Sequence, residues 1–474
     1  MRPLALVVLL GLAGCGGSAP AAAPPATSTV QTTLVDRDRD GFLERGGPGE
    51  PLRDRGTPVR AGGTLATFGQ LTDTHVRDEE SPARVPFLDR LGAPLNSTFR
   101  PHEAFSTQVL DAAVRALARE RPQAVVVTGD IADSAQENEL DAAIAVLEGG
   151  AVRPDSGAPG YDGVQAAGNP DPFYFRPDTD APRHPGALAA AQREFRAAGF
   201  GVPWYPAIGN HDVLVQGEVP STEAIEELAT GSRLVTGLDP DSLPYLDEDG
   251  AADIVNDLLA YGEAYGRSET VPADGARRHP EPDEVVERLA RAAGIRPATP
   301  ERLDYAFDLG TEVRGIVLDT VNREGGSRGA VSPDQVEWLR EQLARAGQRW
   351  VIAFAHNPLE SSDGGEAALA ALDGADRVAA VVAGNRHRNT IEARDSYWLV
   401  GTSSLADFPQ QARMFRLREA GEGVVLETWM VDHDGRGLAG TARELAHLDA
   451  QGGRPQGFAG RPEDRNARLF VQQP

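Results

Sequence analysis

The sequence predicts an α/β fold in which β-sheets are flanked by helices. From Thr64 onward, short apolar runs alternate with helical patterns, which is typical of strands joined by crossover helices. Hydrophobic residues make up 41% of the 474 positions, enough for a large core and too many for a disordered chain. At about 150 residues per domain, this length allows up to three domains or one large domain with insertions.

The predicted strands are six apolar runs, at residues 65–72, 124–128, 204–208, 315–318, 350–354 and 378–383. Between the first two runs we expect a helix, because apolar residues recur on one helical face at Phe105, Val109, Ala112 and Ala116. A second helix should begin at Ser332, where Pro333 and Gln335 complete a start signal. Residues 414–431 indicate antiparallel strands that close a second sheet.

The N-terminus resembles a bacterial lipoprotein signal. An apolar run over residues 3–12 is too short to cross a bilayer and leads into Leu-Ala-Gly-Cys15. The resemblance implies that residues 1–14 are a signal peptide and that Cys15 is lipidated, so the protein would be exported and anchored to the cell envelope. We expect residues 15–63 to be a flexible tether, residues 64–435 to be the folded domain, and residues 436–474 to be a polar C-terminal tail.

The charged residues exclude several classes of chemistry. There are 46 basic and 71 acidic residues, which gives a net charge of −25, and every basic residue is Arg. The absence of Lys excludes a phosphate-loop lysine and a lysine Schiff base. The acidic excess argues against binding long nucleic acid. Cys15 is the only cysteine, which excludes disulfides within the chain and cysteine-rich metal sites.

Residues 36–47 resemble the first half of a calcium-binding loop. Alternating carboxylates at Asp36, Asp38 and Asp40 precede a turn glycine, but Gly47 stands where the loop would need a bidentate Glu. Two interpretations remain open, a calcium site and a charge-rich linker.

Metal-ligand residue types follow the predicted strands directly. They are Asp73 and His75, Asp130 and Asp133, Asn210, His211 and Asp212, His356, and Asn385 and His387. In open α/β sheets, sites form beyond the carboxyl ends of the strands. Mixed oxygen and imidazole ligands suit divalent first-row metals, and a carboxylate such as Asp130 can bridge two of them.

The order D-x-H, G-D-x-x-D, G-N-H-D, a lone His after a strand, and G-x-x-H resembles the calcineurin-like metallophosphoesterase superfamily. The chain is similar to an exported bacterial group with long inserts between these motifs. The resemblance implies a four-layer αββα sandwich of two mixed sheets, with residues 64–435 as the catalytic domain. Purple acid phosphatases, which use a Tyr in the second motif, are excluded because Asp133 occupies that place.

The resemblance also assigns roles to these residues. The first metal would be held by Asp73, His75, Asp130 and His387. The second would be held by Asp130, Asn210 and His356, with Asn385 as the fourth ligand. His211 would act as general acid or leaving-group stabiliser, oriented by Asp212. The metals would be two divalent ions (Mn, Fe, Zn or Co), and a metal-activated hydroxide would hydrolyse small phosphate monoesters or diesters.

One ligand position departs from the family, which usually has His where this chain has Asn385. An amide oxygen is usually a weaker metal ligand than imidazole. The alternative function is therefore a non-catalytic or one-metal envelope binding protein on the same fold.

The long spacers between the motifs, residues 76–128, 131–208 and 213–355, leave the sheet at its ligand-bearing edge. We therefore expect them to form the rim of the site and to determine substrate choice. The spacer loop 325–329 matches the G-x-S-x-G pattern, but no strand and helix adjoin its Ser, so it does not predict a serine hydrolase. The histidines without ligand spacing are expected to be surface or packing residues, namely His102, His184, His279, His433 and His447.

Overall fold

The computed structural model describes residues 27–38, 43–91, 97–238, 266–451 and 457–472. Two β-sheets form its centre. The larger has seven strands in the order β3-β19-β18-β17-β4-β5-β8. Their bounds are β3 (Arg53–Arg55), β4 (Ala61–Leu71), β5 (Ala124–Thr128), β8 (Trp204–Ala207), β17 (Gln411–Ala420), β18 (Gly423–Asp432) and β19 (Ala467–Val471).

The second sheet has six strands in the order β11-β12-β13-β14-β16-β15. They are β11 (Tyr305–Asp308), β12 (Val313–Leu318), β13 (Trp350–Ala355), β14 (Val378–Ala383), β15 (Thr390–Arg394) and β16 (Tyr397–Gly401). The central strands are parallel and the two edge strands are antiparallel. Every residue of β13 and β14 is buried, as expected for strands covered on both faces.

Aromatic side chains pack the two sheets against each other. Phe68 of β4 meets Phe354 of β13 edge to face, with ring centroids 5.7 Å apart. Tyr205 of β8 stacks on Phe307 of β11 at 3.8 Å. Such ring pairs add about 0.5–1.5 kcal/mol each beyond the area they bury. The two sheets therefore share one hydrophobic core, and their strand ends lie at a common edge.

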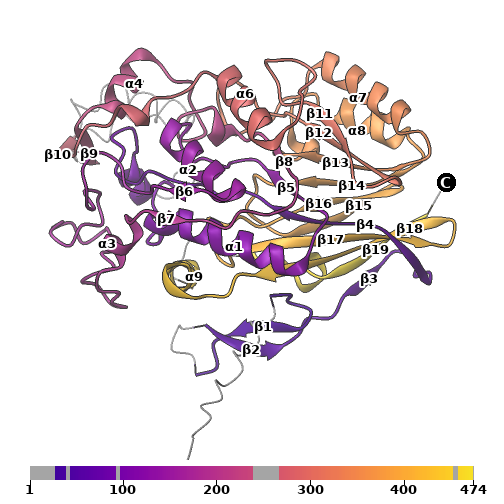
Figure 1. Cartoon of the computed structure of the whole chain (residues 1–474), viewed down its shortest axis with the longest axis horizontal. Helices are drawn as coiled ribbons and strands as arrows, with labels where there is room; N and C mark the ends of the chain where they lie inside the picture. Colours follow the sequence, from indigo (N-terminus) through magenta and orange to yellow (C-terminus); the bar gives the residue numbers. More distant parts are fainter. Residues whose placement is uncertain (1–26, 39–42, 92–96, 239–265, 452–456, 473–474) are drawn as a thin grey trace, which may run out of the picture.

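Helices cover the outer faces of both sheets (Figure 1). On the larger sheet, α1 (Ser106–Glu120) contacts α2 (Glu137–Glu148) and α9 (Gly437–Gln451). On the smaller sheet, α7 (Pro333–Ala346) and α8 (Gly365–Asp373) bury a separate cluster that includes Leu339 and Leu369. The predicted αββα sandwich is therefore confirmed.

The spacers between the motifs carry most of the remaining elements. These are β6 (Ala151–Val152), α3 (Ala187–Ala191), β7 (Phe195–Arg196), α4 (Glu223–Thr230), β9 (Arg233–Leu238), β10 (Gly266–Thr270) and α6 (Pro282–Ala293). Short 3-10 turns occur at Pro86–Leu91, Glu103–Phe105, Asn210–Asp212, Gly275–Arg277, Leu359–Ser361 and Pro462–Asp464. Helix α6 packs on α2 and on the edge strand β8.

The predicted strands and helices are present. Helix α7 begins as expected, with Ser332 as its N-cap and Gln335 completing the capping box. The strands predicted over 414–431 are β17 and β18, and they are antiparallel. They do not close the second sheet, however. Because β17 pairs with β4, both strands extend the first sheet.

The two chain ends differ from the expected tether and tail. Strand β3 pairs with β19, which in turn pairs with β18, so both ends add strands to the larger sheet. Thr29 binds Met430 and Asn466 through its backbone and hydroxyl. In the expected tail, α9 and β19 bury small or single apolar residues such as Ala442 and Leu469. Because polar residues surround them in the sequence, they form no continuous apolar run that would predict a buried element. Residues 1–26, which include the predicted signal and Cys15, lie outside the described residues.

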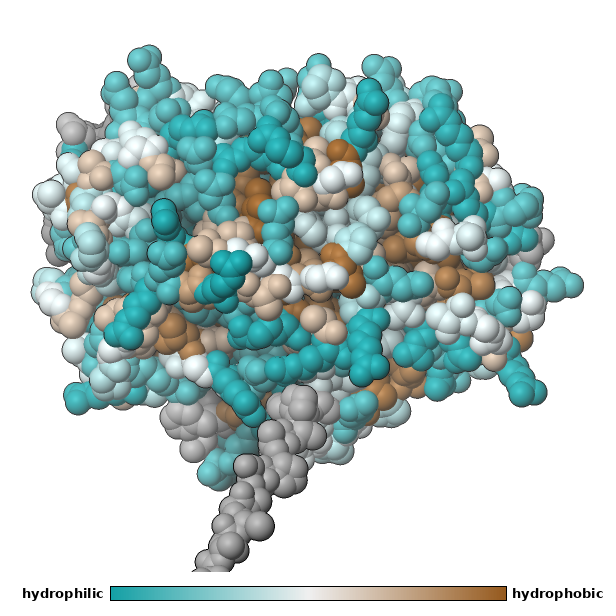
Figure 2. Space-filling view, viewed as in Figure 1, coloured by the Kyte–Doolittle hydropathy of each residue, from teal (hydrophilic) through white to brown (hydrophobic). Residues whose placement is uncertain are grey.

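The proposed calcium loop, residues 36–47, follows β1 (Thr32–Val35) directly, and its last four residues belong to β2 (Glu44–Pro48). β1 and β2 form an antiparallel hairpin, and Asp40 and Gly41 lie outside the described residues. Within the described ranges, no helix is both long and apolar enough to span a bilayer. The face in Figure 2 is largely hydrophilic, with small and separate hydrophobic areas.

Candidate metal centre

The predicted ligand residues come from strand ends of both sheets. Asp73 and His75 follow β4, Asp130 follows β5, and Asn210 follows β8 in the larger sheet. In the smaller sheet, His356 follows β13, while Asn385 and His387 follow β14. The carboxyl ends of these strands meet, and the structure brings the residues into one pocket or its buried floor.

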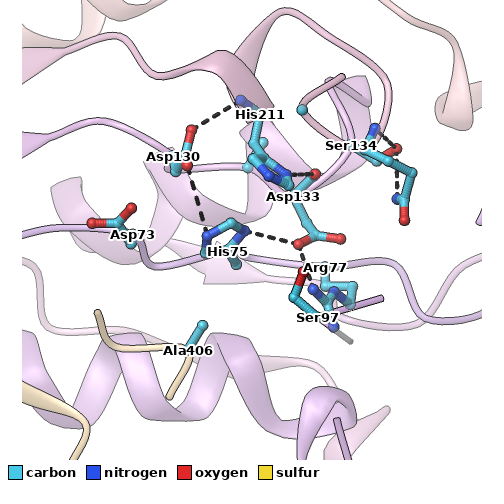
Figure 3. A network of polar contacts seen from close by, with 12 residues as sticks. Asp73, His75, Arg77, Ser97, Asp130, Asp133, Ser134, His211 and Ala406 are labelled. Carbon is cyan, nitrogen blue, oxygen red and sulfur yellow. Dashed lines mark hydrogen bonds and ion pairs between the residues drawn. The ribbon is translucent and has the colours of Figure 1, made fainter. Parts of the chain in front are cut away.

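Four of them form one compact group. Asp73, His75, Asp130 and His387 each offer a ligand atom, and these atoms all lie within 4.8 Å of one another. The Nε2 atoms of His75 and His387 are 3.2 Å apart, and His387 Nε2 is 3.3 Å from Asp73 Oδ1. Figure 3 shows His75 between the carboxylates of Asp73, Asp130 and Asp133. This is the set that the resemblance assigned to the first metal.

A second group shares Asp130 with the first. His356 Nε2 lies 3.1 Å from Asp130 Oδ2 and 3.2 Å from Asn210 Oδ1. Asn385 lines the same pocket, and its backbone N–H donates to the Asp73 carboxylate at 3.0 and 3.2 Å. Three of the four predicted second-metal ligands are therefore joined by side-chain contacts, with His356 between Asp130 and Asn210.

All three imidazoles turn Nε2 toward the carboxylates. His356 Nδ1 is 2.8 Å from the Thr128 carbonyl oxygen, and because a carbonyl only accepts, this nitrogen carries the proton. His75 Nδ1 faces Asp133 and His387 Nδ1 faces Asp407. The Nε2 atoms, each with a lone pair, are therefore the available ligand atoms. Lone pairs this close repel each other unless a proton or a cation lies between them. The donor set fits divalent first-row metal ions.

The carboxylates make this cluster a strong attractor for positive charge. Burial alone would lower the pKa of His356, but Asp130 and Asp73 outweigh it and raise this pKa to about 9. Burial would also lower the pKa of His387, but Asp73 and Asp407 outweigh it and raise this pKa to about 10. Burial would raise the pKa of Asp130, yet the neighbouring imidazoles of His356 and His211 hold it below its usual value.

The backbone is strained where it presents the ligands. Asp73, His75, Asp130, Asn385 and His387 have φ angles of 42–64°, and they are five of the ten non-glycine residues with positive φ among the described residues. Such conformations cost roughly 1 kcal/mol or more each and cluster at functional sites. The motif glycines allow close approach, since a Cβ on Gly209 would lie 2.2 Å from Asp130 Oδ1.

His211 lies beside the group, as expected, but Asp212 does not orient it. His211 Nδ1 contacts the carbonyl oxygen of Asp133. Asp212 is buried and accepts backbone N–H groups of Gly209, Ile131 and Ala132 at 2.8–2.9 Å. Its side chain therefore joins the loops that follow β5 and β8, and it is a structural residue. Although Asp212 is next to His211 in sequence, the turn at residues 210–212 directs the two side chains apart.

The pocket has a volume of about 650 Å³. Two of the three spacers line it as predicted, the first with Ser97 and Thr98 and the third with Gln216, Glu218 and the loop segment 326–328, whereas the second contributes only Asp133 of the motif. This segment of the G-x-S-x-G loop lies between β12 and α7 without a nucleophile elbow. Phe458, from the expected tail, also lines the pocket and packs on His387 with ring centroids 6.2 Å apart. No spacing rule could have indicated it.

Sequence reasoning also missed the residues behind the ligands. Asp407 follows β16 and binds His387, while Arg77 and Arg100 bind Asp133 and Asp407. The only available signal was that Asp407, like the ligands, follows a parallel strand. The histidines without ligand spacing lie outside the metal-ligand groups found among the described residues.

This chain belongs to the calcineurin-like phosphoesterase family, whose sequence pattern matches residues 66–389. No curated protein sequence matches it. Among solved structures it is similar to a dimetal phosphatase from Danio rerio, at 15% identity over 78% of this chain and 97% of that one, with a TM-score of 0.40. It is also similar to a purple acid phosphatase from yellow lupin (Lupinus luteus) seeds, at 13% identity over 82% of this chain and 53% of that one, with a TM-score of 0.32.

Proposed function

We propose that this protein is a metal-dependent hydrolase of phosphate esters with a dinuclear centre. The observation that carries the proposal is the pair of donor groups that share Asp130, in which each imidazole has its Nδ1 engaged and its Nε2 turned inward. A carboxylate placed between two donor groups is the bridging ligand that a two-metal site needs.

The residues divide into two ligand sets. Asp73, His75, Asp130 and His387 would hold the first metal, and Asp130, Asn210 and His356, with Asn385, would hold the second. When bound, two divalent cations neutralise phosphoryl oxygens and acidify a water molecule, which is most of what phosphate ester hydrolysis requires. His211 lines the pocket with Nδ1 held by a carbonyl, so Nε2 is the nitrogen from which the imidazolium form could protonate a leaving group.

The proposed substrates are small phosphate monoesters or diesters of low charge. A net charge of −25 disfavours long polyanions, and a pocket of about 650 Å³ accommodates a small organic ester. Arg328 and Arg386 stand at the pocket, each paired with a carboxylate, Asp363 and Glu360 respectively. They are positioned to exchange that partner for a phosphate oxygen.

The test is reconstitution of the metal-free full chain with Mn, Fe, Zn or Co, followed by assay on aryl phosphate monoesters and diesters. We expect turnover that requires two metal equivalents. Asp130→Asn should lower it by more than about a hundredfold, because that change removes the bridging charge shared by both ligand sets. Asp432→Asn is the matched control, since Asp432 is a buried aspartate outside the site. No turnover with any metal, or near-normal turnover of Asp130→Asn, would refute the proposal.

A second candidate function follows from Asn385, which replaces the usual His of the family. If the amide does not support the second metal, the protein would be a one-metal or non-catalytic binding protein. Binding of one metal equivalent without turnover in the same assay would favour this candidate.

A further inference from the structure

The two histidines of the first ligand set have matching outer partners. On one side, His75 Nδ1 lies 2.9 Å from Asp133 Oδ1, and Arg77 Nη2 donates to the same oxygen at 2.5 Å. Figure 3 shows this chain of contacts. On the other side, His387 Nδ1 contacts Asp407 Oδ2, and Arg100 Nε donates to Asp407 Oδ1 at 2.7 Å. We call these two chains the His75 arm and the His387 arm.

Both arms end on Glu103, in the turn before α1. Its Oε2 accepts from Arg77 Nη1 at 2.8 Å and from the backbone N–H of Arg100 at 3.0 Å. Arg84 closes the arrangement by donating to both oxygens of Glu103, at 2.8 and 3.0 Å. Glu103, Arg84 and Arg77 are all at least nine-tenths buried. Burial raises the pKa of Glu103, but Arg84 and Arg77 outweigh it and keep the carboxyl ionised.

We propose that Glu103 is a positioning residue that sets the affinity and the ligand geometry of the first metal site through both arms at once. This inference rests on the proposed function. A carboxylate already bound by arginine is a weaker acceptor, so each imidazole would keep its Nδ1 proton and leave its Nε2 lone pair to a bound metal. Glu103 in turn holds the two arginines in place, by a charged contact to Arg77 and by fixing the backbone of Arg100.

The arrangement gives the spacer between the first two motifs a role in orienting the ligands. Residues 76–128 supply Arg77, Arg84, Arg100 and Glu103, so this spacer does more than form the rim. It carries the parts that orient two ligands belonging to different sheets. Loss of the Glu103 charge would leave the buried arginines Arg77 and Arg84 facing each other and would release both arms together.

The experiment is titration of the metal-free full chain with Co²⁺, whose visible absorption reports both binding and ligand geometry. Wild type should bind two equivalents. In Glu103→Gln, one equivalent should bind about 10–100-fold more weakly with a changed absorption spectrum, while the other keeps its affinity. The weakened equivalent should be the first site. Asn210→Ala, which lacks a second-site ligand, identifies it, because the equivalent that this variant still binds is the first site. Glu427→Gln is the control, because Glu427 of β18 is also buried and also pairs with arginines, Arg416, Arg418 and Arg468, and it should match wild type.

Two equivalents of unchanged affinity and spectrum in Glu103→Gln would overturn the inference while leaving the proposed function intact. Wild type that binds no Co²⁺ would overturn the proposed function, and the inference with it. If Glu103→Gln does not fold, the same Co²⁺ titration is made on Arg100→Met, which keeps Glu103 and removes the contacts of the His387 arm to Asp407. One equivalent should again bind more weakly with a changed spectrum, and two unchanged equivalents would overturn the inference.

Discussion

Asn385 occupies a left-handed backbone position at φ 64°, where its N–H holds the Asp73 carboxylate. Histidine is also among the residues that adopt this conformation. We therefore predict that Asn385→His folds normally and strengthens the second metal site by on the order of tenfold, or about 1.4 kcal/mol, because imidazole is the better ligand. Metal content at limiting Mn or Zn measures this directly.

Asn385→Gln is the control, since it keeps an amide at that position and should not strengthen binding. A histidine variant with weaker metal binding would show that the asparagine is an adapted ligand or a substrate contact.

His279 gives the protein a pH-dependent stability that is independent of the metal site. It is 6% exposed, and burial lowers its pKa to about 4. The folded state therefore binds fewer protons than the unfolded state, whose His titrates near 6.5, and stability is lost as pH falls below that value. We predict that unfolding at pH 5 is easier than at pH 7.5 by about 2 kcal/mol from this residue alone.

Denaturant unfolding of wild type and His279→Gln at both pH values tests this prediction. The variant should lose that part of the pH dependence, whereas His184→Gln, at a partly exposed site, should retain it. Equal pH dependence in wild type and His279→Gln would contradict the prediction.

At the scale of residues, the sequence predicted the candidate metal ligands better than the residues that support them. Asp73, Asp130 and His356 follow buried strands in short motifs, so chain order alone indicates their position. Asp407 is bound by Arg100, which lies 307 positions away, and no local pattern encodes such a contact. Asp212 was assigned wrongly because adjacency in sequence does not fix where a side chain points.

At the scale of elements, β19 is an internal strand, between β3 and β18, and its Leu469 is fully buried. We predict that Leu469→Ala destabilises the protein by about 2–5 kcal/mol, because it leaves a cavity in the core. Thermal or denaturant unfolding measures the change.

Arg468→Ala is the matched control on the same strand. Arg468 pairs with Asp54 and Glu427 while partly exposed, and such pairs contribute about 0–1 kcal/mol. If Leu469→Ala were as mild as this control, β19 would not be an integral strand of the sheet.

Strands that are continuous apolar runs were predictable, including the edge strand β8, whereas a short charged edge strand such as β3 was not. β13 and β14 are continuous apolar runs because both faces are covered, whereas β3 is a three-residue charged segment whose pairing with β19 depends on the rest of the sheet. The sheet to which β17 and β18 belong is fixed by β17 pairing with β4, a contact that depends on tertiary structure.

At the scale of the whole molecule, we propose that the protein is exported and anchored to the cell envelope through Cys15. The support is the N-terminal signal pattern, which ends at the only cysteine. We predict that the full-length protein expressed in bacteria fractionates with membranes and that Cys15→Ser moves it to the soluble extracytoplasmic fraction. Fractionation with mass measurement of the N-terminal peptide checks both points.

Ser18→Ala, in the same segment, is the control and should stay with the membranes. Wild type found in the cytoplasm, or without a lipid mass on Cys15, would contradict this prediction.

The overall architecture was predictable because the family motifs fix which strands present ligands, and those strands specify both sheets. What the sequence left open is how three long spacers pack around that frame, since their contacts involve side chains such as Arg84 and Phe458 with no periodic signal.

Because the ligands are divided between two stacked sheets, the spacing of the donor atoms depends on how those sheets register against each other. We therefore expect substitutions at Phe68 or Phe354, deep in the shared core, to change the distances between the candidate ligand atoms of the two sheets without replacing any of them.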